Sequence, residues 1–284
     1  MNRLINFLNR HKVFTFLLGG LYFLLTVLLH LEVSKISVWF QSKLSTAVYN
    51  NMLGIIGLVA VSFFSLYLLN RIRKGDDRKF KILCLSLTIT LVVISFNTLL
   101  SINIEYIHFL QYAILSIPIF AITLKFGETV FWTTILGTVD EAYQYFILDP
   151  DFKYFDFNDV ILNLIGGGIG VILILTTLSK LQFQGLYYNR LSGKWFRSKV
   201  IIISMVLLLG LLILYSAGYV HFSPGPDSTG ASILLRRELP PSAFWISVAW
   251  GKTYHVLHPI EGIVLTGILV GFYSFIDFKI WKNI

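Results

Sequence analysis

Charged side chains are scarce in this 284-residue chain. Asp, Glu, Lys and Arg make up 13% of the residues, against about 25% in an ordinary soluble domain. Hydrophobic residues reach 56%, and the mean hydropathy is +0.74. Apolar stretches of about 20 residues recur, each long enough to cross a bilayer core of about 30 Å. This composition excludes an ordinary soluble domain and predicts an integral membrane protein.

Several features that would point to other functions are missing. The one cysteine, Cys84, excludes an intramolecular disulfide. The sequence has no Ser or Cys nucleophile motif, phosphate loop, dinucleotide fingerprint or DNA-binding motif. The net charge of +8 comes from basic residues in short segments between apolar stretches, where such residues set membrane orientation. We therefore expect no nucleic-acid partner.

The apolar stretches predict a single all-α transmembrane domain over residues 1–284, a polytopic helical bundle of about eight spans. Ten-residue segments of alternating hydrophobicity, typical of a membrane β-barrel, are absent. The first stretch is longer than a signal-peptide core, and no small-x-small cleavage site follows it, so we expect it to be retained. The predicted spans are 13–32, 52–70, 82–102, 107–126, 129–148, 158–179, 199–219 and 255–277.

The distribution of charge predicts the orientation. Only six of the 23 Lys and Arg residues lie on the side opposite the N-terminus, which favours both termini inside the cell. Residues 220–250 then form the longest extracytoplasmic loop. Residues 183–198 mix aromatic and basic side chains and suit a membrane surface, either as a connector or as a lipid-binding segment.

Polar residues recur at helical spacing near the outer ends of four predicted spans. Residues three, four or seven apart share one helix face, and a polar face inside a membrane points to the bundle interior or to water. We therefore expect one shared pocket that is open to the outside. The four sets are Glu105, His108 and Tyr112; Asp140, Glu141 and Gln144; Asp156, Asp159 and Asn163; and His255, His258 and Glu261, preceded by Lys252.

Acid/base chemistry is the predicted activity of this pocket. We interpret His108, Asp140 and Glu141 as catalytic, because two adjacent acids in a partly desolvated site are not expected to be ionised together. Arg236 and Arg237 suit a phosphate or a carboxylate, or equally the lipid headgroups. The predicted substrate contacts are Glu105, Gln144, Asp159, Asn163, Arg236, Arg237, Lys252, His255, His258 and Glu261.

Each element also has a structural interpretation. Gly166 and Gly170 suit close helix packing, and we predict a structural role for both. Asp156 and Asp159 suit helix caps. Tyr112 suits an interfacial anchor or a packing residue, and His255 and His258 suit contacts with lipid headgroups. A divalent metal would need three His, Asp or Glu side chains to converge. His-x-x-His-x-x-Glu is a weak signal for that, so we predict no metal and no cofactor.

Three of these segments together resemble the VanZ-like family of bacterial membrane proteins. They are Glu105-Tyr-Ile-His108, Asp140-Glu141-Ala-Tyr-Gln144, and Asp159-Val-Ile-Leu-Asn163-Leu-Ile-Gly166, within a core of about residues 80–180. The resemblance implies a multi-pass protein of the bacterial cytoplasmic membrane and an effect on teicoplanin-type glycopeptide resistance. It marks His108, Asp140, Glu141, Gln144, Asp159, Asn163 and Gly166. Glu105 and Lys153 depart from the family pattern, which often has Lys and Arg there.

Two functions follow as hypotheses. In the first, an enzyme acts on a phospholipid or a lipid-linked envelope precursor in the outer leaflet. In the second, a non-enzymatic protein binds such a lipid and shields or sequesters it. The enzyme should lose turnover when His108 or Asp140 is replaced, whereas a binding protein should lose affinity gradually. A proton-coupled transporter is disfavoured, because no polar path reaches the cytoplasmic side.

Overall fold

The fold is that of an all-α helical membrane protein. The computed structural model describes residues 1–148, 154–178, 199–225, 232–237, 244–248 and 251–282. Five helices in this part of the chain are long and apolar enough to cross a membrane, or six if the bent pair α1 and α2 counts as one span. The membrane-protein prediction is thus confirmed, while the count of eight spans stays a prediction. Lys153 and segment 183–198 lie outside the described residues.

The described helices match the predicted apolar stretches one for one and add three elements. α2, α4, α5, α6, α7, α8, α10 and α11 occupy the eight stretches. The additions are α1, α3 and the 3-10 turn η1. The bounds are α1 Asn2–Arg10, α2 Lys12–Leu28, α3 His30–Leu44, α4 Thr46–Arg73, α5 Arg78–Thr98, η1 Asn103–Tyr106, α6 Ile107–Thr123, α7 Phe126–Tyr143, a π-turn η2 Gln144–Leu148, α8 Phe157–Thr177, α10 Lys199–Ser216 and α11 Pro259–Lys282.

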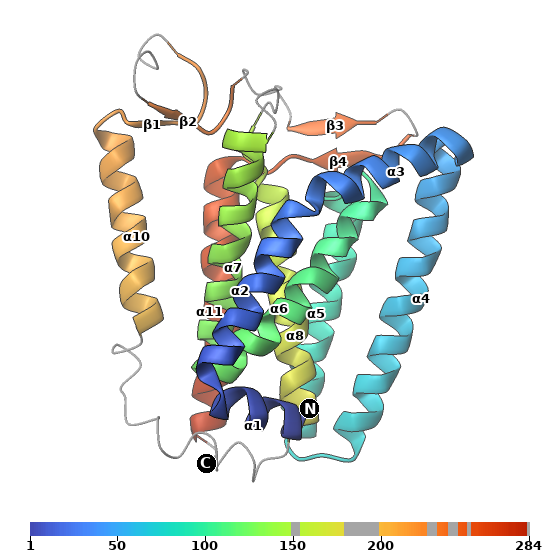
Figure 1. Ribbon diagram of the computed structural model, residues 1–284, viewed down its shortest axis with the longest axis vertical. Coiled ribbons are helices and arrows are strands. Elements are labelled where there is room, and N and C mark those ends of the chain that lie inside the picture. Colours follow the sequence, from blue (N-terminus) through green and yellow to red (C-terminus); the bar gives the residue numbers. More distant parts are fainter. Residues whose placement is uncertain (149–153, 179–198, 226–231, 238–243, 249–250, 283–284) are drawn as a thin grey trace.

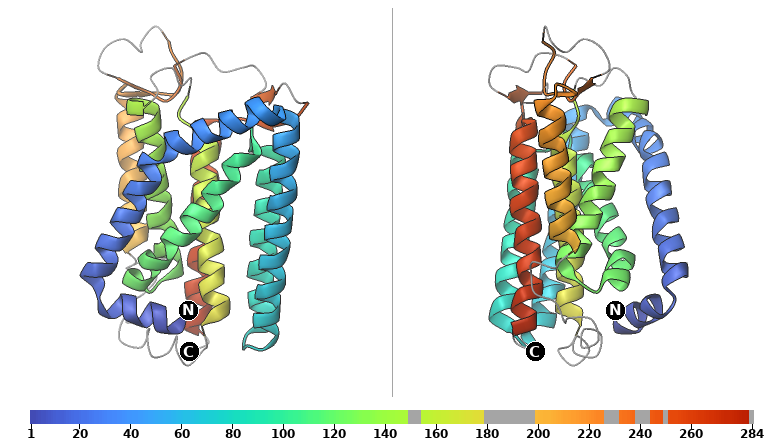
Figure 2. Two further views of the ribbon diagram at one scale, coloured as in Figure 1. Left: turned by 45° about the vertical axis from the view of Figure 1, so that its right-hand side comes forward. Right: turned by 90° about the vertical axis from the view of Figure 1, so that its left-hand side faces the viewer.

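Helix α8 lies at the centre of the bundle (Figure 1), packed against α5, α6, α7 and α11. It is apolar on nearly every face, and almost all of its residues from Val160 to Thr176 are buried. A helix that is apolar all round is expected in such a position. By contrast, α4 and α10 lie at the periphery (Figure 2) with many exposed apolar side chains.

Glycines bring α8 very close to α6. A Cβ atom added at Gly166 would lie 2.8 Å from the His108 carbonyl oxygen and 2.9 Å from the Tyr112 Cβ. At Gly170 an added Cβ would run into Ser116 and the Ala113 carbonyl. Small residues at a membrane helix interface allow this kind of backbone approach. The two glycines therefore set the distance between the helices that carry the predicted site residues.

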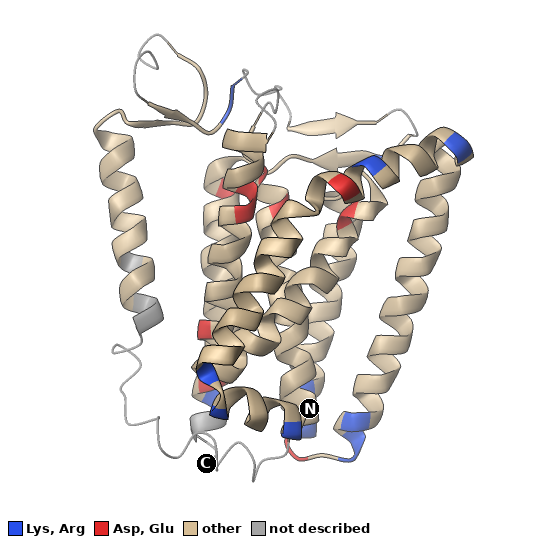
Figure 3. Cartoon of the chain, viewed as in Figure 1, with Lys and Arg blue, Asp and Glu red and all other residues tan. Residues whose placement is uncertain are grey.

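The two ends of the bundle differ in charge. Both termini lie at one end, called here the terminal end, where Lys and Arg gather (Figure 3). Most acids lie toward the opposite, site end, apart from those near the terminal end of α7 and α11 and in the α4–α5 turn. The site end is covered by the cap, which comprises the described residues between 220 and 258.

The cap contains two short strand pairs that the sequence did not predict. β1 (Val220–His221) pairs in parallel with β2 (Ile233–Leu234), with Val220 opposite Ile233. β3 (Trp245–Ser247) pairs antiparallel with β4 (Thr253–His255), with Ile246 opposite Tyr254. The predicted eighth span was to begin at His255, but that residue ends β4. The helix begins only at Pro259, a residue favoured at the first helical position because it has no N–H to satisfy.

The first predicted span is also shorter than expected. α2 ends at Leu28, and α3 begins at His30 as a separate helix across the site end (Figure 1). At the terminal end, α1 meets α2 at 106° and packs against α6 through buried Ile5 and Leu8. These short helices have too few apolar residues in sequence to be recognised as spans.

Replacing Gly166 by Ala should destabilise the protein. The added methyl group has no room between α8 and α6, and overpacking of this kind costs about 1–3 kcal/mol. We expect a lower melting temperature and a lower folded yield in detergent. Gly267→Ala in α11 is the matched control, because no atom lies within 4 Å of the added Cβ. Equal melting temperatures for the two variants would show that the contact is not tight.

Candidate functional site

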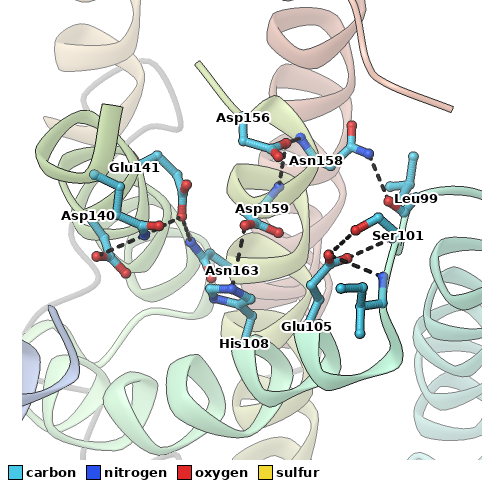
Figure 4. A network of polar contacts seen from close by, with 12 residues as sticks. Leu99, Ser101, Glu105, His108, Asp140, Glu141, Asp156, Asn158, Asp159 and Asn163 are labelled. Carbon is cyan, nitrogen blue, oxygen red and sulfur yellow. Dashed lines mark hydrogen bonds and ion pairs between the residues drawn. The ribbon is translucent and has the colours of Figure 1, made fainter. Parts of the chain in front are cut away.

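Polar side chains from α6, α7 and α8 meet near the site end (Figure 4). We call this group the polar cluster: His108 and Tyr112 of α6, Asp140, Glu141 and Gln144 at the end of α7, and Asp159 and Asn163 of α8. Three of the four sets expected from the sequence therefore come together. All members except Asp159 are buried.

His108 forms the centre of the polar cluster. Its Nε2 lies 3.6 Å from Asp159 Oδ2, with 3% of the His108 side chain and 16% of the Asp159 side chain exposed. That separation suits an ion pair and exceeds a normal hydrogen bond. The Asn163 amide lies beside the ring (Figure 4). Neither His108 Nδ1 nor Asn163 Oδ1 completes a hydrogen bond within the described chain. An imidazole beside a carboxylate, with its other nitrogen free, is arranged as a general base.

Asp140 and Glu141 are held by neutral donors. Tyr112 donates its hydroxyl to Asp140 Oδ2 at 3.0 Å. The Gln144 amide donates to Asp140 Oδ1 at 3.3 Å and to Glu141 Oε1 at 3.4 Å. Asn163 Nδ2 lies 3.5 Å from Glu141 Oε1. The two carboxyls thus face α6 and α8 respectively, and the Gln144 amide connects them.

Local sequence explains these positions. Gln144 lies one turn after Asp140, so both fall on one face of the helix. Gly137, one turn before Glu141, leaves the space that Asn163 occupies: a Cβ there would lie 2.7 Å from the Asn163 Cβ. A larger residue at position 137 would push the Asn163 amide away from Glu141.

Glu105 and Asp156 lie beside the polar cluster and bond to backbone. Glu105 accepts hydrogen bonds from the Ser101 N–H at 2.8 Å, from the Ile102 N–H and from the Ser101 hydroxyl. Asp156 caps α8 by accepting from the Asn158 N–H at 2.8 Å and the Asp159 N–H at 3.4 Å. Glu105, a predicted substrate contact, therefore stabilises the turn before α6. Asp159 lies in the first turn of α8 and also faces His108.

The fourth polar set joins the cap instead of the polar cluster. His255 Nδ1 lies 3.1 Å from the Phe244 carbonyl and Nε2 lies 3.0 Å from Glu261 Oε2. Glu261 also accepts from the His258 N–H at 2.8 Å. The link to α8 is Asn158, which donates to the His255 carbonyl and accepts from the Leu257 N–H. His255, His258 and Glu261 thus fix the start of α11.

The three predicted basic contacts lie in different places. Lys252 Nζ donates to the Phe96 carbonyl at 3.0 Å and lies 3.4 Å from Asn103 Oδ1. Burial lowers the Lys252 pKa, while the charge of Glu105 opposes this shift. Arg237 donates to the Tyr145 carbonyl at 2.7 Å and lies over the Tyr145 ring. Arg236 is buried within the cap. These side chains do not form a joint cationic site.

Sequence reasoning missed one contributor. His30, the first residue of α3, is partly buried, and its ring centroid lies 6.0 Å from that of His108. It falls at the end of an apolar stretch without a periodic polar partner, so no spacing signal marks it. Tyr112 belongs to the first polar set expected from the sequence, where it was interpreted as an interfacial anchor or a packing residue. Its side chain is 0% exposed and bonds to Asp140, so it packs in the interior and is not an interfacial anchor.

The described residues contain no group of three or more His, Cys, Asp or Glu side chains arranged to hold a metal ion. No family model, curated protein or solved structure matches the chain. The resemblance to VanZ-like proteins therefore stays a prediction. The function is inferred from the geometry of the polar cluster.

Replacing Tyr112 by Phe should lower stability. The change keeps the ring but removes the donor to Asp140 Oδ2, and an unsatisfied buried acceptor costs about 1–3 kcal/mol. Thermal unfolding in detergent should show the decrease. Tyr219→Phe is the control, since Tyr219 is 59% exposed. A Tyr112→Phe protein as stable as the control would mean that the contact contributes nothing.

Replacing Asp156 by Asn should reduce the pH dependence of stability. Burial raises the Asp156 pKa above 3.8, while bonds from the Asn158 and Asp159 N–H groups and the charge of Arg236 oppose this shift. The folded state therefore holds the proton more tightly, and stability falls as pH rises from near 3.8 through the folded-state pKa.

Asn also caps helices well, so the variant should keep α8 intact. The melting temperature of Asp156→Asn relative to wild type should rise with pH across this window and then level off. Asp76→Asn, at the exposed α4–α5 turn, is the control. A constant difference across the window would contradict the assigned shift.

Proposed function

We propose that this protein is an acid/base enzyme of the outer membrane leaflet that acts on the polar headgroup of a phospholipid or a lipid-linked envelope precursor. The observation that carries the proposal is the buried His108 ring, with Asp159 at Nε2 and no hydrogen bond to Nδ1 from the part of the chain that the structure describes. A buried polar atom without a partner is unfavourable, and a substrate or water hydroxyl at Nδ1 would satisfy it.

In the proposed reaction, His108 Nδ1 accepts the proton of an attacking hydroxyl or water. Asp159 orients the ring and balances its positive charge. The Asp140 and Glu141 pair supplies a proton to the leaving oxygen, because burial and mutual repulsion favour one protonated carboxyl. Gln144 and Asn163 position these groups. His30, whose ring centroid lies 6.0 Å from that of His108, adds a second imidazole.

Membrane topology supports a lipid substrate. The polar cluster lies toward the site end of the bundle, within the apolar helices, and the terminal end carries most of the Lys and Arg residues (Figure 3). By the positive-inside rule the terminal end is cytoplasmic, so the polar cluster is extracytoplasmic. Asp159, which faces His108, is partly exposed, so in this proposal the headgroup approaches His108 past Asp159.

A binding protein without turnover is the second candidate. The observation that favours it is the set of neutral donors that hold Asp140 and Glu141 in place. Carboxylate oxygens held in this way have lone pairs left to accept hydrogen bonds from a polyhydroxyl or amide headgroup. Shielding of an envelope precursor by this means would alter sensitivity to a teicoplanin-type glycopeptide, as the VanZ-like resemblance suggests.

His108→Gln and Asp140→Asn should each abolish turnover. The purified protein is reconstituted with a total bacterial envelope lipid extract, and mass spectrometry follows which lipid is consumed over time. Loss of acid/base assistance should slow the reaction by about a hundredfold or more. His11→Gln, an exposed residue at the terminal end, is the control.

Undiminished turnover in both site variants would contradict the enzyme proposal. A lipid that copurifies with the wild-type protein, survives incubation unchanged and is released by Asp140→Asn would favour the binding protein instead. Folding of each variant is checked by its elution profile and melting temperature, so that loss of structure is not mistaken for loss of chemistry.

A further inference from the structure

Arg236 is an arginine of the cap with 3% of its surface exposed. The neighbouring backbone is fixed to the ends of α7 and α8. Phe155 N–H donates to the Leu235 carbonyl at 2.8 Å, and the Tyr145 hydroxyl donates to the Leu234 carbonyl at 2.9 Å. Tyr154 and Arg236 also form an isolated antiparallel bridge. The guanidinium therefore has a defined position.

Aromatic rings flank this guanidinium. Its Cζ lies 5.0 Å from the Tyr154 ring centroid and 4.8 Å from that of Phe244, within the range of cation–π attraction. Rings hold the cation but do not accept its N–H groups in strong hydrogen bonds. Nε has no hydrogen-bond partner among the described residues. Asp156 interacts with the guanidinium electrostatically, but no described carboxylate lies within ion-pair distance.

This situation distinguishes Arg236 from the other two basic residues. Arg237 and Lys252 donate to the backbone carbonyls of Tyr145 and Phe96. Arg236 alone combines burial with an unused donor. A buried charge is costly unless it is paired and hydrogen-bonded, so an oxyanion at this position would satisfy both requirements. A planar guanidinium is well suited to phosphate.

We propose that Arg236, between Tyr154 and Phe244, binds a single phosphate group of the ligand whose headgroup reaches the polar cluster. This inference rests on the proposed function, since it names a charged group of the same ligand. One phosphate is favoured over a pyrophosphate because the carboxyl of Asp156 acts on the same guanidinium and repels further negative charge. The ligand is then a lipid with a monophosphate headgroup and not a diphosphate-linked precursor.

Equilibrium binding tests the proposal. Protein in a phosphate-free detergent is titrated by calorimetry at constant ionic strength with inorganic phosphate, pyrophosphate and a short-chain phosphatidic acid. Wild type should bind phosphate or the phosphatidic acid more tightly than pyrophosphate. Arg236→Gln should weaken binding about tenfold or more, the loss expected for a charge-assisted hydrogen bond. Arg237→Gln should stay within about threefold of wild type.

Asp156→Asn provides a second measurement in the opposite direction. It removes the negative charge nearest to Arg236 while keeping a capping residue, so phosphate should bind more tightly. This arm remains decisive if Arg236→Gln does not fold. Equal phosphate affinity in wild type and Asp156→Asn, undiminished affinity in a folded Arg236→Gln, or tighter binding of pyrophosphate would each overturn the proposal.

The probes also separate the sources of the phosphate. Binding of the phosphatidic acid alone supports a lipid headgroup, binding of inorganic phosphate supports a free phosphate or small ester, and binding of neither overturns the inference. Because no turnover is involved, the two proposals fail separately. A protein that binds phosphate through Arg236 but consumes no lipid contradicts the enzyme, and one that consumes lipid with Arg236 irrelevant contradicts only this site.

Discussion

The close approach of α6 and α8 is the constraint on which the polar cluster depends. Gly166 lies directly against the His108 carbonyl and the Tyr112 Cβ, so the backbone of α6 rests on α8 at the level of the site. That contact determines where His108 stands relative to Asp159 and where Tyr112 stands relative to Asp140. A wider spacing would lengthen the His108–Asp159 separation, which is already at the limit of an ion pair. The packing and the chemistry are therefore set by the same glycines.

Charge compensation in this region uses few cations. Asp140 and Glu141 are stabilised by a tyrosine and two amides, and Asp156 and Glu105 by backbone N–H groups. These neutral donors fix the carboxyl oxygens in place without an ion pair. Arg236 and Lys252, which interact electrostatically with Asp156 and Glu105 respectively, both belong to the cap. The cap therefore brings positive charge to a site that the bundle alone leaves acidic.

The sequence predicted the apolar helices and the meeting of three polar sets, because both follow from local rules. A polar face on an apolar helix must turn away from lipid, and His108, Asp140 and Asp159 each lie on such a face. The same rule led us to expect His255 and His258 in the same pocket. These two lie in the cap just before α11, where His255 bonds to Phe244 and Glu261 and the His258 ring accepts from the Ile260 N–H. The sequence likewise predicts that Glu105 contacts a substrate. In the structure its carboxyl accepts hydrogen bonds from the Ser101 and Ile102 N–H groups.

Composition and periodicity by themselves determined that the chain is a helical membrane protein and which residues share a helix face. They also marked the positions where a polar side chain inside the membrane would be unfavourable without a polar partner. These are properties of single segments and of their transfer from water to lipid. Tertiary structure alone decided that His30 approaches His108, that Tyr112 bonds to Asp140, and that Arg236 is buried between two rings. Each of these contacts joins segments far apart in the chain, and the geometry of such a contact depends on how closely helices pack, which no local pattern encodes.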